Sequence, residues 1–549
     1  MKVLGLNGWT ERGHDAGASL IVDGKLVYAI EEERLTRLKH AYDTIPSKSI
    51  KHALKFENLK LDEIDKFYIG WDYPTLYKML NEKFISKEEM SKQLFNNEKY
   101  ANKIEYISHH LAHAYSTFYP SNYEEALVLV IDGQGEYMAT SIYSANRNNK
   151  EMNLLMETPI SLGYFYTAIT KHVGFKSGQE GKTMGLAPYG KPSYYDELKK
   201  YIYLDEDGNL NCNFKINKTS KDEEEQSLIK WRELLETIIP KNLNSILQID
   251  ESVQKYADLA ASAEKLLEEI VVNLVIKYVN ETDIHNICIA GGVGLNCPMS
   301  SAIENLNIVD KVFVQPASND GGISLGAAIY GAIKEGDNID IEMIPYLGDE
   351  SNDEEILSSI KEKNYEYEYF DDIEKQIAYL LSKDYIVCNF QGRIEFGPRA
   401  LGNRSILANP MKKETLVKIN TLKGREVWRP LAPAVLYDKQ TTCFDSDIFS
   451  PHMTKNFNVL PDKENKLQAI THIDKTARVQ SVTKKYNERF YNIIEEFYKI
   501  TNVPVVINTS FNTKGEPIVC TPLEAIECFE KMNFDYLALG NYLIKRKEE

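Results

Sequence analysis

The sequence predicts an α/β protein with two domains, the first of which contains a duplicated unit of strand, glycine turn and strand. Three observations lead to this prediction. The chain has 549 residues, which suits two or three domains of ordinary size. A glycine-turn meander occurs twice in the first 150 residues, and an acidic stretch later interrupts the apolar pattern.

The first meander opens the chain. Apolar runs at residues 2–6, 17–22 and 25–30 predict three strands, joined by a polar turn at residues 7–13 and by Asp23-Gly24. A comparable pattern returns at residues 126–131 and 137–144, with a turn at residues 132–136 between them. The repetition predicts two related lobes.

Helices and further strands follow from periodicity and turn residues. Helices are expected at residues 47–55, 87–95 and 109–116, and a long one at residues 253–279. Residues 286–290 predict a short apolar strand that runs into the glycine turn 291–296. At such a turn, phosphate or ribose can approach the backbone closely. The alternative is that the glycines only let a helix pack closely on a strand. Residues 312–314 predict a strand before Asp320, and residues 322–332 a helix rich in small residues.

An acidic stretch at residues 335–375 indicates the domain boundary, which we place within residues 345–365. Strands and helices of a second globular unit are expected at residues 378–381, 386–390, 431–436 and 503–507. The predicted domains are therefore residues 1–350 and 365–549.

Charge and cysteine content narrow the functional class. The net charge of −17 argues against a general nucleic-acid or membrane-surface binder. Seven cysteines without a Cys-x-x-Cys pair fit reduced thiols, and no apolar run reaches membrane-spanning length. We expect a soluble protein of the cytoplasm that contacts neither nucleic acid nor membrane.

Two histidines and a distant aspartate form a candidate metal site. On a helix, His109 and His113 lie four residues apart on one face and can reach a single cation. Asp320 follows a predicted strand and can supply a carboxylate. For a bare His-x-x-x-His pair, packed and hydrogen-bonded histidines are the common alternative.

A basic stretch in the second domain forms a candidate anion site. Residues 391–430 hold nine Lys or Arg against three Glu, inside an acidic protein. Arginines on glycine and proline turns suit bidentate capture of phosphate, whereas a solvated basic face is the alternative. The cations are Arg393, Arg399, Arg404, Lys423, Arg425 and Arg429, and Ser510 and Asn512 add polar groups after a strand.

With these residues, the chain resembles the NodU/CmcH-type O-carbamoyltransferases of nodulation-factor and antibiotic biosynthesis over essentially its whole length. The resemblance rests on motifs that occur in one order: Leu6-Asn7 with His14-Asp15, the acidic run 31–33 with Arg34, the histidine stretch 109–113, Asp132-Gly133, residues 181–187, Gly291-Gly292 and the two arginine-rich stretches.

The resemblance implies a fold and a reaction. The first domain is expected to be similar to threonylcarbamoyltransferase subunits of the actin and sugar-kinase (ASKHA) superfamily, and the second to YrdC-type synthases. The second domain would make carbamoyl-adenylate from carbamoyl phosphate and ATP with Mg²⁺. The first would transfer the carbamoyl group to a hydroxyl of a small-molecule acceptor, a sugar or natural product.

The resemblance also implies residue roles. His109, His113 and Asp320 would hold a divalent metal, Fe(II) by resemblance, although zinc or manganese also suits these ligands. His14, beside Asp15, would be the general base, with a surface turn residue as the alternative. Lys182 would meet phosphate or substrate, or else pair with Glu180. Asp132, Gly133, Gly291, Gly292 and Asn296 would contact the nucleotide.

A small-molecule kinase of the ASKHA superfamily is the main rival. It explains the duplicated meander and the glycine turn, but it leaves the second domain and the histidine–aspartate set without a role. The sequence is compatible with a homodimer, and the acceptor class and the identity of the metal follow from the resemblance alone.

Overall fold

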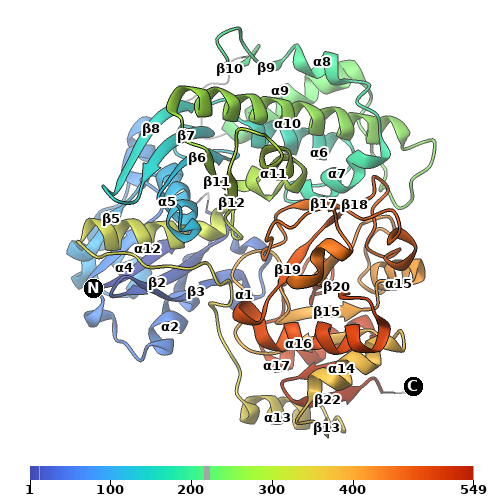
Figure 1. The fold of residues 1–549 in the computed structure, drawn as a ribbon. Helices are drawn as coiled ribbons and strands as arrows, with labels where there is room; N and C mark the ends of the chain where they lie inside the picture. Colours follow the sequence, from blue (N-terminus) through green and yellow to red (C-terminus); the bar gives the residue numbers. More distant parts are fainter. Residues whose placement is uncertain (12, 215–222, 548–549) are drawn as a thin grey trace. The chain divides into compact units, whose positions relative to one another are not determined.

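The computed structural model describes residues 1–11, 13–214 and 223–547 of a mixed α/β protein (Figure 1). Two compact units make up the chain: unit 1 is Met1–Glu32 with Ala41–Met343, and unit 2 is Glu33–His40 with Ile344–Glu549. No motif in the sequence indicates that the short early segment groups with unit 2. Arg12, within the turn predicted over residues 7–13, lies outside the described residues.

Unit 1 contains two five-stranded sheets with the same strand order. The first sheet is ordered β3 (Lys25–Glu31), β2 (Gly17–Val22), β1 (Lys2–Asn7), β4 (Lys66–Ile69) and β5 (Ile104–Tyr106). The second is ordered β8 (Glu151–Thr158), β7 (Thr140–Asn146), β6 (Glu125–Ile131), β11 (Asn286–Ala290) and β12 (Lys311–Val314).

The two sheets also agree in strand direction. In each, the first three strands along the chain form an antiparallel meander, and the last two add in parallel to the first. This is the duplication that the sequence predicts. Strands β4, β5 and β8 complete the two sheets. They are short or half-exposed, and their apolar patterns do not identify them as strands in the sequence.

Two helices bring the candidate metal ligands together. Helix α5 (His109–Ser121) packs against α12 (Ile323–Lys334), which also lies on β1. The contact is very close, because a Cβ on Gly326 would stand 1.7 Å from the carbonyl oxygen of Ala112. Glycine is therefore required there, and the first turn of α5 comes to lie beside the start of α12, next to Asp320.

The long helix α10 (Gln254–Thr282) contacts α6 (Leu162–His172), α7 (Glu180–Leu186) and α11 (Cys297–Glu304), as Figure 1 illustrates. It forms where the sequence predicts a helix over residues 253–279. The other described helices and strands of unit 1 are α2 (Ser47–Phe56), α3 (Tyr73–Met79), α4 (Lys87–Phe95), α8 (Tyr195–Lys199), β9 (Ile202–Leu204), β10 (Leu210–Cys212) and α9 (Glu223–Ile238).

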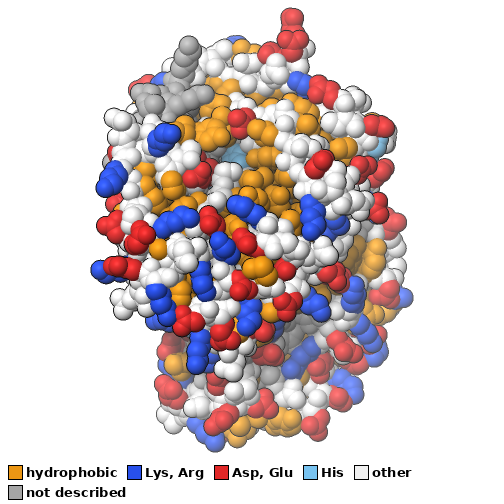
Figure 2. Space-filling view, turned by 90° about the vertical axis from the view of Figure 1, so that its left-hand side faces the viewer, with side chains coloured by type: hydrophobic (Ala, Val, Ile, Leu, Met, Phe, Trp, Pro, Cys, Tyr) orange, Lys and Arg blue, Asp and Glu red, His pale blue; other side chains and the backbone are white. Residues whose placement is uncertain are grey.

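Strand β8 is an exposed edge of the second sheet. Its Leu154 and Leu155 are 47% and 37% exposed. Figure 2 faces the side on which Figure 1 draws β8, and hydrophobic side chains gather in its upper part, with mixed charges elsewhere. Glu151 and Glu157 bracket these apolar residues, a charge pattern that disfavours pairing of this edge with another strand.

Unit 2 is built on one mixed eight-stranded sheet. Its strand order is β13 (Glu368–Tyr369), β22 (Tyr542–Lys545), β21 (Tyr536–Leu539), β14 (Val387–Phe390), β15 (Arg404–Ala408), β20 (Val505–Ser510), β16 (Ala432–Leu436) and β19 (Gln480–Val482). Its helices are α13 (Asp353–Glu362), α14 (Ile373–Ser382), α15 (Lys413–Leu422), α16 (Lys484–Thr501) and α17 (Pro522–Met532), and β17 (Asn456–Asn458) pairs with β18 (Thr476–Arg478).

The segment Glu33–His40, which contains most of α1 (Glu32–Thr36), is held in unit 2 by arginine–carbonyl hydrogen bonds. Arg34 is fully buried and donates to Gly397 O at 2.7 Å. Arg37 donates to Ile518 O at 2.7 Å and to Pro517 O at 2.8 Å.

Among the described residues, no helix combines the length and hydropathy needed to cross a bilayer.

Candidate functional site

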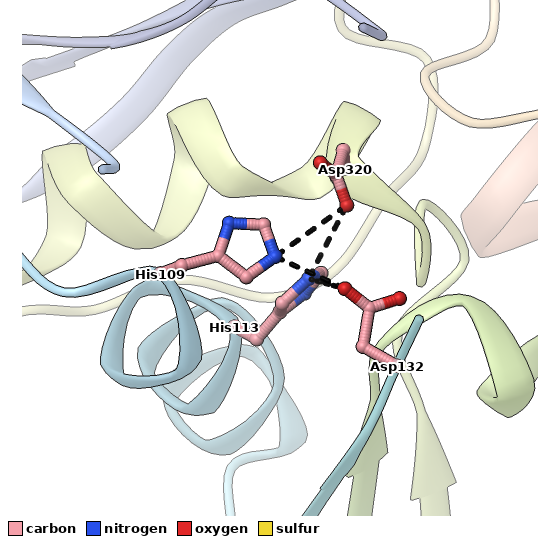
Figure 3. Close-up of side chains that lie close together, drawn as sticks. All are labelled: His109, His113, Asp132 and Asp320. Carbon is pink, nitrogen blue, oxygen red and sulfur yellow. Dashed lines mark hydrogen bonds and ion pairs between the residues drawn. The ribbon is translucent and has the colours of Figure 1, made fainter. Parts of the chain in front are cut away.

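Four buried side chains of unit 1 converge on one point (Figure 3). His109 and His113 come from the first two turns of α5, Asp132 follows β6, and Asp320 follows β12. Strands β6, β11 and β12 are parallel neighbours, so residues after their carboxyl ends meet at one edge of the sheet. Helix α5 presents both imidazoles to that edge.

The distances within this four-residue cluster fit a metal ion. Nε2 of His109 lies 3.1 Å from Oδ2 of Asp132 and 3.6 Å from Oδ1 of Asp320, and Nε2 of His113 lies 3.7 Å from each of these oxygens. Around a metal with bonds of about 2.1 Å, neighbouring ligand atoms lie about 3.0–3.4 Å apart. Among the described residues, Nε2 of His113 has no hydrogen-bond partner. Two imidazoles and two carboxylates therefore suit a divalent cation.

Asp132 belongs to the metal cluster, whereas the sequence analysis expects it to contact the nucleotide. Its Oδ1 accepts a hydrogen bond from Gly292 N at 2.9 Å, which turns Oδ2 toward the histidines. A signal for this placement exists in the sequence: Asp132 and Asp320 both follow short buried strands, as expected for two ligands at one sheet edge.

Charges within the cluster compensate each other. Burial would lower the pKa of His113, but the attraction of the nearby Asp132 and Asp320 carboxylates outweighs it and raises the pKa to about 9. Burial would likewise raise the pKa of Asp132, yet His109 and His113 hold it well below its usual range. Without a metal, the two carboxylates thus favour the protonated form of His113.

A buried glutamate fixes the first turn of α5. Glu136 accepts hydrogen bonds from His109 N at 2.9 Å and from Asp72 N at 2.7 Å. The free N–H groups of a helix start are stabilised by such a carboxylate. His110, on the same turn, bonds through Nδ1 to Ser141 Oγ at 2.7 Å and is not part of the cluster.

His14 and Asp15 lie beside the cluster. Nε2 of His14 is 3.6 Å from Oδ2 of Asp320, and its Nδ1 is 3.1 Å from Oδ2 of Asp15. Asn319 donates to the same Asp15 oxygen at 2.9 Å. The charges of Asp320 and Asp15 raise the pKa of His14 to about 10, and 45% of its side chain is exposed.

The glycine turn after β11 contacts the metal cluster from the other side. Gly291 has φ +89°, and a Cβ there would stand 2.3 Å from Ile131 O, so only glycine fits. Gly292 bonds to Asp132, and Gly133 lies against the Tyr164 ring. The structure therefore brings Asp132, Gly133 and the two glycines together.

Asn296, at the end of that turn, uses its side chain within the protein. Its Oδ1 caps α11 by accepting from Met299 N at 2.9 Å, and its Nδ2 donates to Glu264 Oε1 at 2.7 Å. Burial raises the pKa of Glu264 to about 7. Glu264 lies within the apolar pattern of α10, where periodicity predicts a core position, so sequence reasoning missed it.

Lys182 is buried on α7, with Nζ 5.3 Å from the centroid of the Phe175 ring. Glu180 accepts from Thr167 Oγ1 at 2.9 Å and from Gly178 N at 3.2 Å. The carboxylate thus stabilises the start of α7, while the lysine packs on an aromatic ring.

A second cluster, in unit 2, consists of cations: Lys423 is buried, and the arginines around it are half-buried. Burial lowers the pKa of Arg425 well below its usual value, and Arg429, Arg478 and Arg399 lower it further. Burial and the charge of Arg425 lower the pKa of Lys423 to about 7. Like charges that depress each other in a buried place form a site for anions. We call Arg399, Lys423, Arg425, Arg429 and Arg478 the cation cluster.

The loop after β20 lines the cation cluster. Lys423 Nζ contacts Ser510 O and donates to Asn512 O at 2.9 Å, and Arg425 Nη1 lies 3.4 Å from Thr509 Oγ1. Ser510 donates to Asn512 Oδ1 at 2.6 Å, which holds the loop in shape. Within the described residues, Nε of Arg425 and Nε of Arg478 make no hydrogen bond.

Two of the arginines predicted to bind anions instead donate hydrogen bonds to backbone carbonyl oxygens of neighbouring loops. Arg404 is fully buried, 3.7 Å from the centroid of the Phe390 ring, and donates to Gln391 O at 2.5 Å and Gly392 O at 3.0 Å. Arg393 donates to Gly348 O at 3.0 Å and contacts Leu347 O. Arg478, by contrast, is a cation that sequence reasoning missed, because it stands outside the glycine-rich stretches.

Comparison with known proteins places these two clusters in a family. The model for the carbamoyltransferase N-terminus matches residues 2–329, and the model for the carbamoyltransferase C-terminus matches residues 378–546. Nodulation protein NolNO of Sinorhizobium fredii is 33% identical over 97% of this chain and 79% of its own length. The uncharacterized protein MJ1051 of Methanocaldococcus jannaschii is 35% identical over 97% of this chain and 98% of its own.

Among solved structures, component A of the (R)-2-hydroxyglutaryl-CoA dehydratase of Acidaminococcus fermentans has 15% identity and a TM-score of 0.33, covering 60% of this chain and 97% of its own. This similarity is too low to define the fold. The two family models, by contrast, cover most of the sequence. The chain therefore belongs to the carbamoyltransferase family and is an enzyme of that class.

Proposed function

We propose that the protein is an ATP-dependent O-carbamoyltransferase that works in two steps. Carbamoyl phosphate, ATP and one water would give carbamoyl-adenylate, phosphate and pyrophosphate. Carbamoyl-adenylate and an acceptor alcohol would then give the O-carbamoylated product, AMP and a proton. The observation that carries the proposal is the partly buried cation cluster of unit 2, because both substrates of the first step are polyanions.

The first step is assigned to unit 2. Arg425, Arg429 and Lys423, with Arg399 and Arg478, would offset the charge of the phosphate groups in a place that excludes water. Ser510 and Asn512 would shape the pocket, and Arg393 and Arg404 would hold its loops rather than contact phosphate. Residues 365–549 would form a YrdC-like domain, as the resemblance implies.

The second step is assigned to unit 1, residues 1–350, as a domain of the actin and sugar-kinase superfamily. The repeated strand order of its two sheets supports this assignment. Gly133, Gly291 and Gly292 would face the nucleotide, and Asn296 would support that turn through Glu264. Lys182 would contact phosphate or substrate from α7.

His109, His113, Asp132 and Asp320 would hold the divalent metal. Fe(II) follows from the resemblance, and zinc or manganese would suit the same donors. When bound, the metal would supply a positive charge that polarises an oxygen of the adenylate.

His14 would accept the proton of the acceptor hydroxyl in its neutral form, which a bound cation would favour by offsetting the charge of Asp320, the main cause of its raised pKa. Asp15 would bond to Nδ1 so that Nε2 faces the reacting group. The exposure of the His14 side chain allows an acceptor to approach.

The seven cysteines are all free, which supports a reducing compartment such as the cytoplasm. We propose a hydroxyl-bearing sugar or natural product as acceptor.

The test is to incubate the protein with ATP, Mg²⁺ and carbamoyl phosphate and to analyse the products by mass spectrometry. The proposal requires pyrophosphate and a mass that corresponds to carbamoyl-adenylate. ADP with a phosphorylated acceptor would instead establish the rival, a small-molecule kinase of the same superfamily.

A further inference from the structure

One buried amide links the loop of the proposed base to the loop of a metal ligand. Asn7, the last residue of β1, is 1% exposed. Its Nδ2 lies 3.0 Å from Asp320 O, 3.0 Å from Asp15 O and 3.2 Å from His14 O. Two hydrogens thus serve three carbonyl oxygens from two segments that are about 300 residues apart in the chain.

The orientation of this amide is fixed by its surroundings. With the amide turned over, Oδ1 would face three carbonyl oxygens, an arrangement of acceptors only. In the observed orientation, Oδ1 of Asn7 has no hydrogen-bond donor within the described part of the chain. The side chain therefore acts here as a donor, and a carboxylate of the same shape could not replace it.

Strand β1 does not depend on this side chain. Its backbone pairs with β2 from Lys2 to Asn7 and with β4 from Val3 to Leu6, and these ladders hold the strand in the sheet. The Asn7 amide instead bonds only to the loops that carry His14 and Asp320, whose side chains lie 3.6 Å apart. Asp15, whose carbonyl oxygen accepts one of these hydrogen bonds, has φ +51°, an uncommon conformation for a residue with a Cβ.

We propose that Asn7 is a positioning residue that holds His14 and Asp320 in register, so that base and metal are set for carbamoyl transfer by one donor group. The inference rests on the proposed function of unit 1. It assigns Asn7 no contact with substrate. Its loss would let the two loops shift against each other, and a displacement of about 1 Å at reacting groups costs about 100-fold in rate.

The experiment compares Asn7→Ala and Asn7→Asp with the wild-type protein. Asn242→Ala is the matched control, because Asn242 is a buried asparagine that also bonds to a loop carbonyl, Val173 O at 3.0 Å, outside the site. Three quantities are measured: pyrophosphate release from ATP and carbamoyl phosphate, kcat and KM for acceptor carbamoylation, and the metal Kd by chelator competition.

For Asn7→Ala we expect kcat of carbamoylation to fall about 100-fold with little change in acceptor KM, and the metal Kd to rise about 10-fold or more. Pyrophosphate release should stay within about twofold of wild type, because unit 2 is untouched. Asn7→Asp should be at least as severe, since it places an acceptor against three carbonyls. The Asn242→Ala control should match wild type in all three measurements.

Wild-type kcat and metal Kd in a folded Asn7→Ala protein would overturn the proposal. If circular dichroism shows that Asn7→Ala is unfolded, Asn7→Leu, which keeps the side-chain volume and removes the donor, takes its place under the same two criteria. Absence of pyrophosphate from the wild-type protein would refute the proposed function instead. The metal Kd does not depend on that reaction, so the two failures are distinguishable.

Discussion

The metal cluster of unit 1 is buried and the cation cluster of unit 2 is partly buried, and the two are built from opposite combinations of charge. In unit 1, two carboxylates face two imidazoles, and the histidines hold the pKa of Asp132 low while Asp132 and Asp320 raise that of His113. In unit 2, positive charges face each other and lower the pKa values of Lys423 and Arg425. The first arrangement suits a cation, and the second needs an anion.

The difference shows how one acidic protein can serve two chemistries. The net charge of −17 is a property of the whole chain, whereas each cluster creates its own local electrostatic potential. The metal cluster is partly neutralised by proton uptake on histidine. In the cation cluster, the carboxylate of Glu426 lies 3.7 Å from Arg429 as a counter-charge.

The largest effect should follow from breaking the metal cluster. His113→Ala removes a buried ligand and leaves Asp132 and Asp320 facing one histidine. We expect carbamoyl transfer to fall by about 10³-fold or more and pyrophosphate release to stay near wild type. Product analysis by mass spectrometry measures both. The exposed His285 offers the control His285→Ala, which should change neither, and an active His113→Ala enzyme would refute the metal role.

Removing one member of the cation cluster should have opposite effects on activity and stability. Arg425→Met deletes a half-buried charge that would bind phosphate, so pyrophosphate release should fall by about 10²-fold. In the absence of anions the variant should melt about 2–4 °C higher, equivalent to about 1 kcal/mol.

Calorimetric melting and a pyrophosphate assay test both halves of this prediction. The exposed Lys412, paired with Asp384, gives the control Lys412→Met, which should alter neither quantity appreciably. A less stable Arg425→Met protein with full activity would mean that the cluster is structural and not a binding site for anions.

A smaller effect is expected from pH, through Lys423. Its pKa is about 7 in the folded protein and 10.5 as a free side chain, so between these values the unfolded chain binds more protons and the stability of the anion-free protein rises with pH. A bound anion favours the ammonium form. Anion binding should therefore take up a proton, and affinity should weaken above pH 7 by up to about tenfold per pH unit.

Titration calorimetry with pyrophosphate at pH 8, in two buffers with different heats of ionisation, measures this proton uptake. In Lys423→Met the uptake should disappear. Equal apparent enthalpies in both buffers for the wild-type protein would exclude a deprotonated Lys423 in the anion-free state.

Sequence reasoning predicted the features that depend on local spacing. The four-residue interval between His109 and His113 fixes one face of a helix, and the repeated glycine turns indicate the duplicated sheets. Strand β8 was not predicted, because it is a half-exposed edge with a bulge at Leu155 rather than a buried apolar run.

The residues that sequence reasoning missed depend on contacts between distant segments. Asp132 joins the metal cluster because β6 and β12 flank β11, a pairing that no single segment encodes. Arg478 approaches Arg425 only through the folded sheet, and Arg34 reaches Gly397 across more than 350 residues. Residue type indicated the chemistry in each case, whereas the tertiary fold decided the partner.

The central claim is that two separate sites carry out the two steps, and selective metal removal tests it most directly. The wild-type protein is treated with 1,10-phenanthroline, which takes transition metals and leaves Mg²⁺ for ATP, and both pyrophosphate release and acceptor carbamoylation are followed. We predict that carbamoylation is lost while pyrophosphate release stays within about twofold, since the cation cluster contains no metal ligand set. Loss of both activities together, or of neither, would contradict the account.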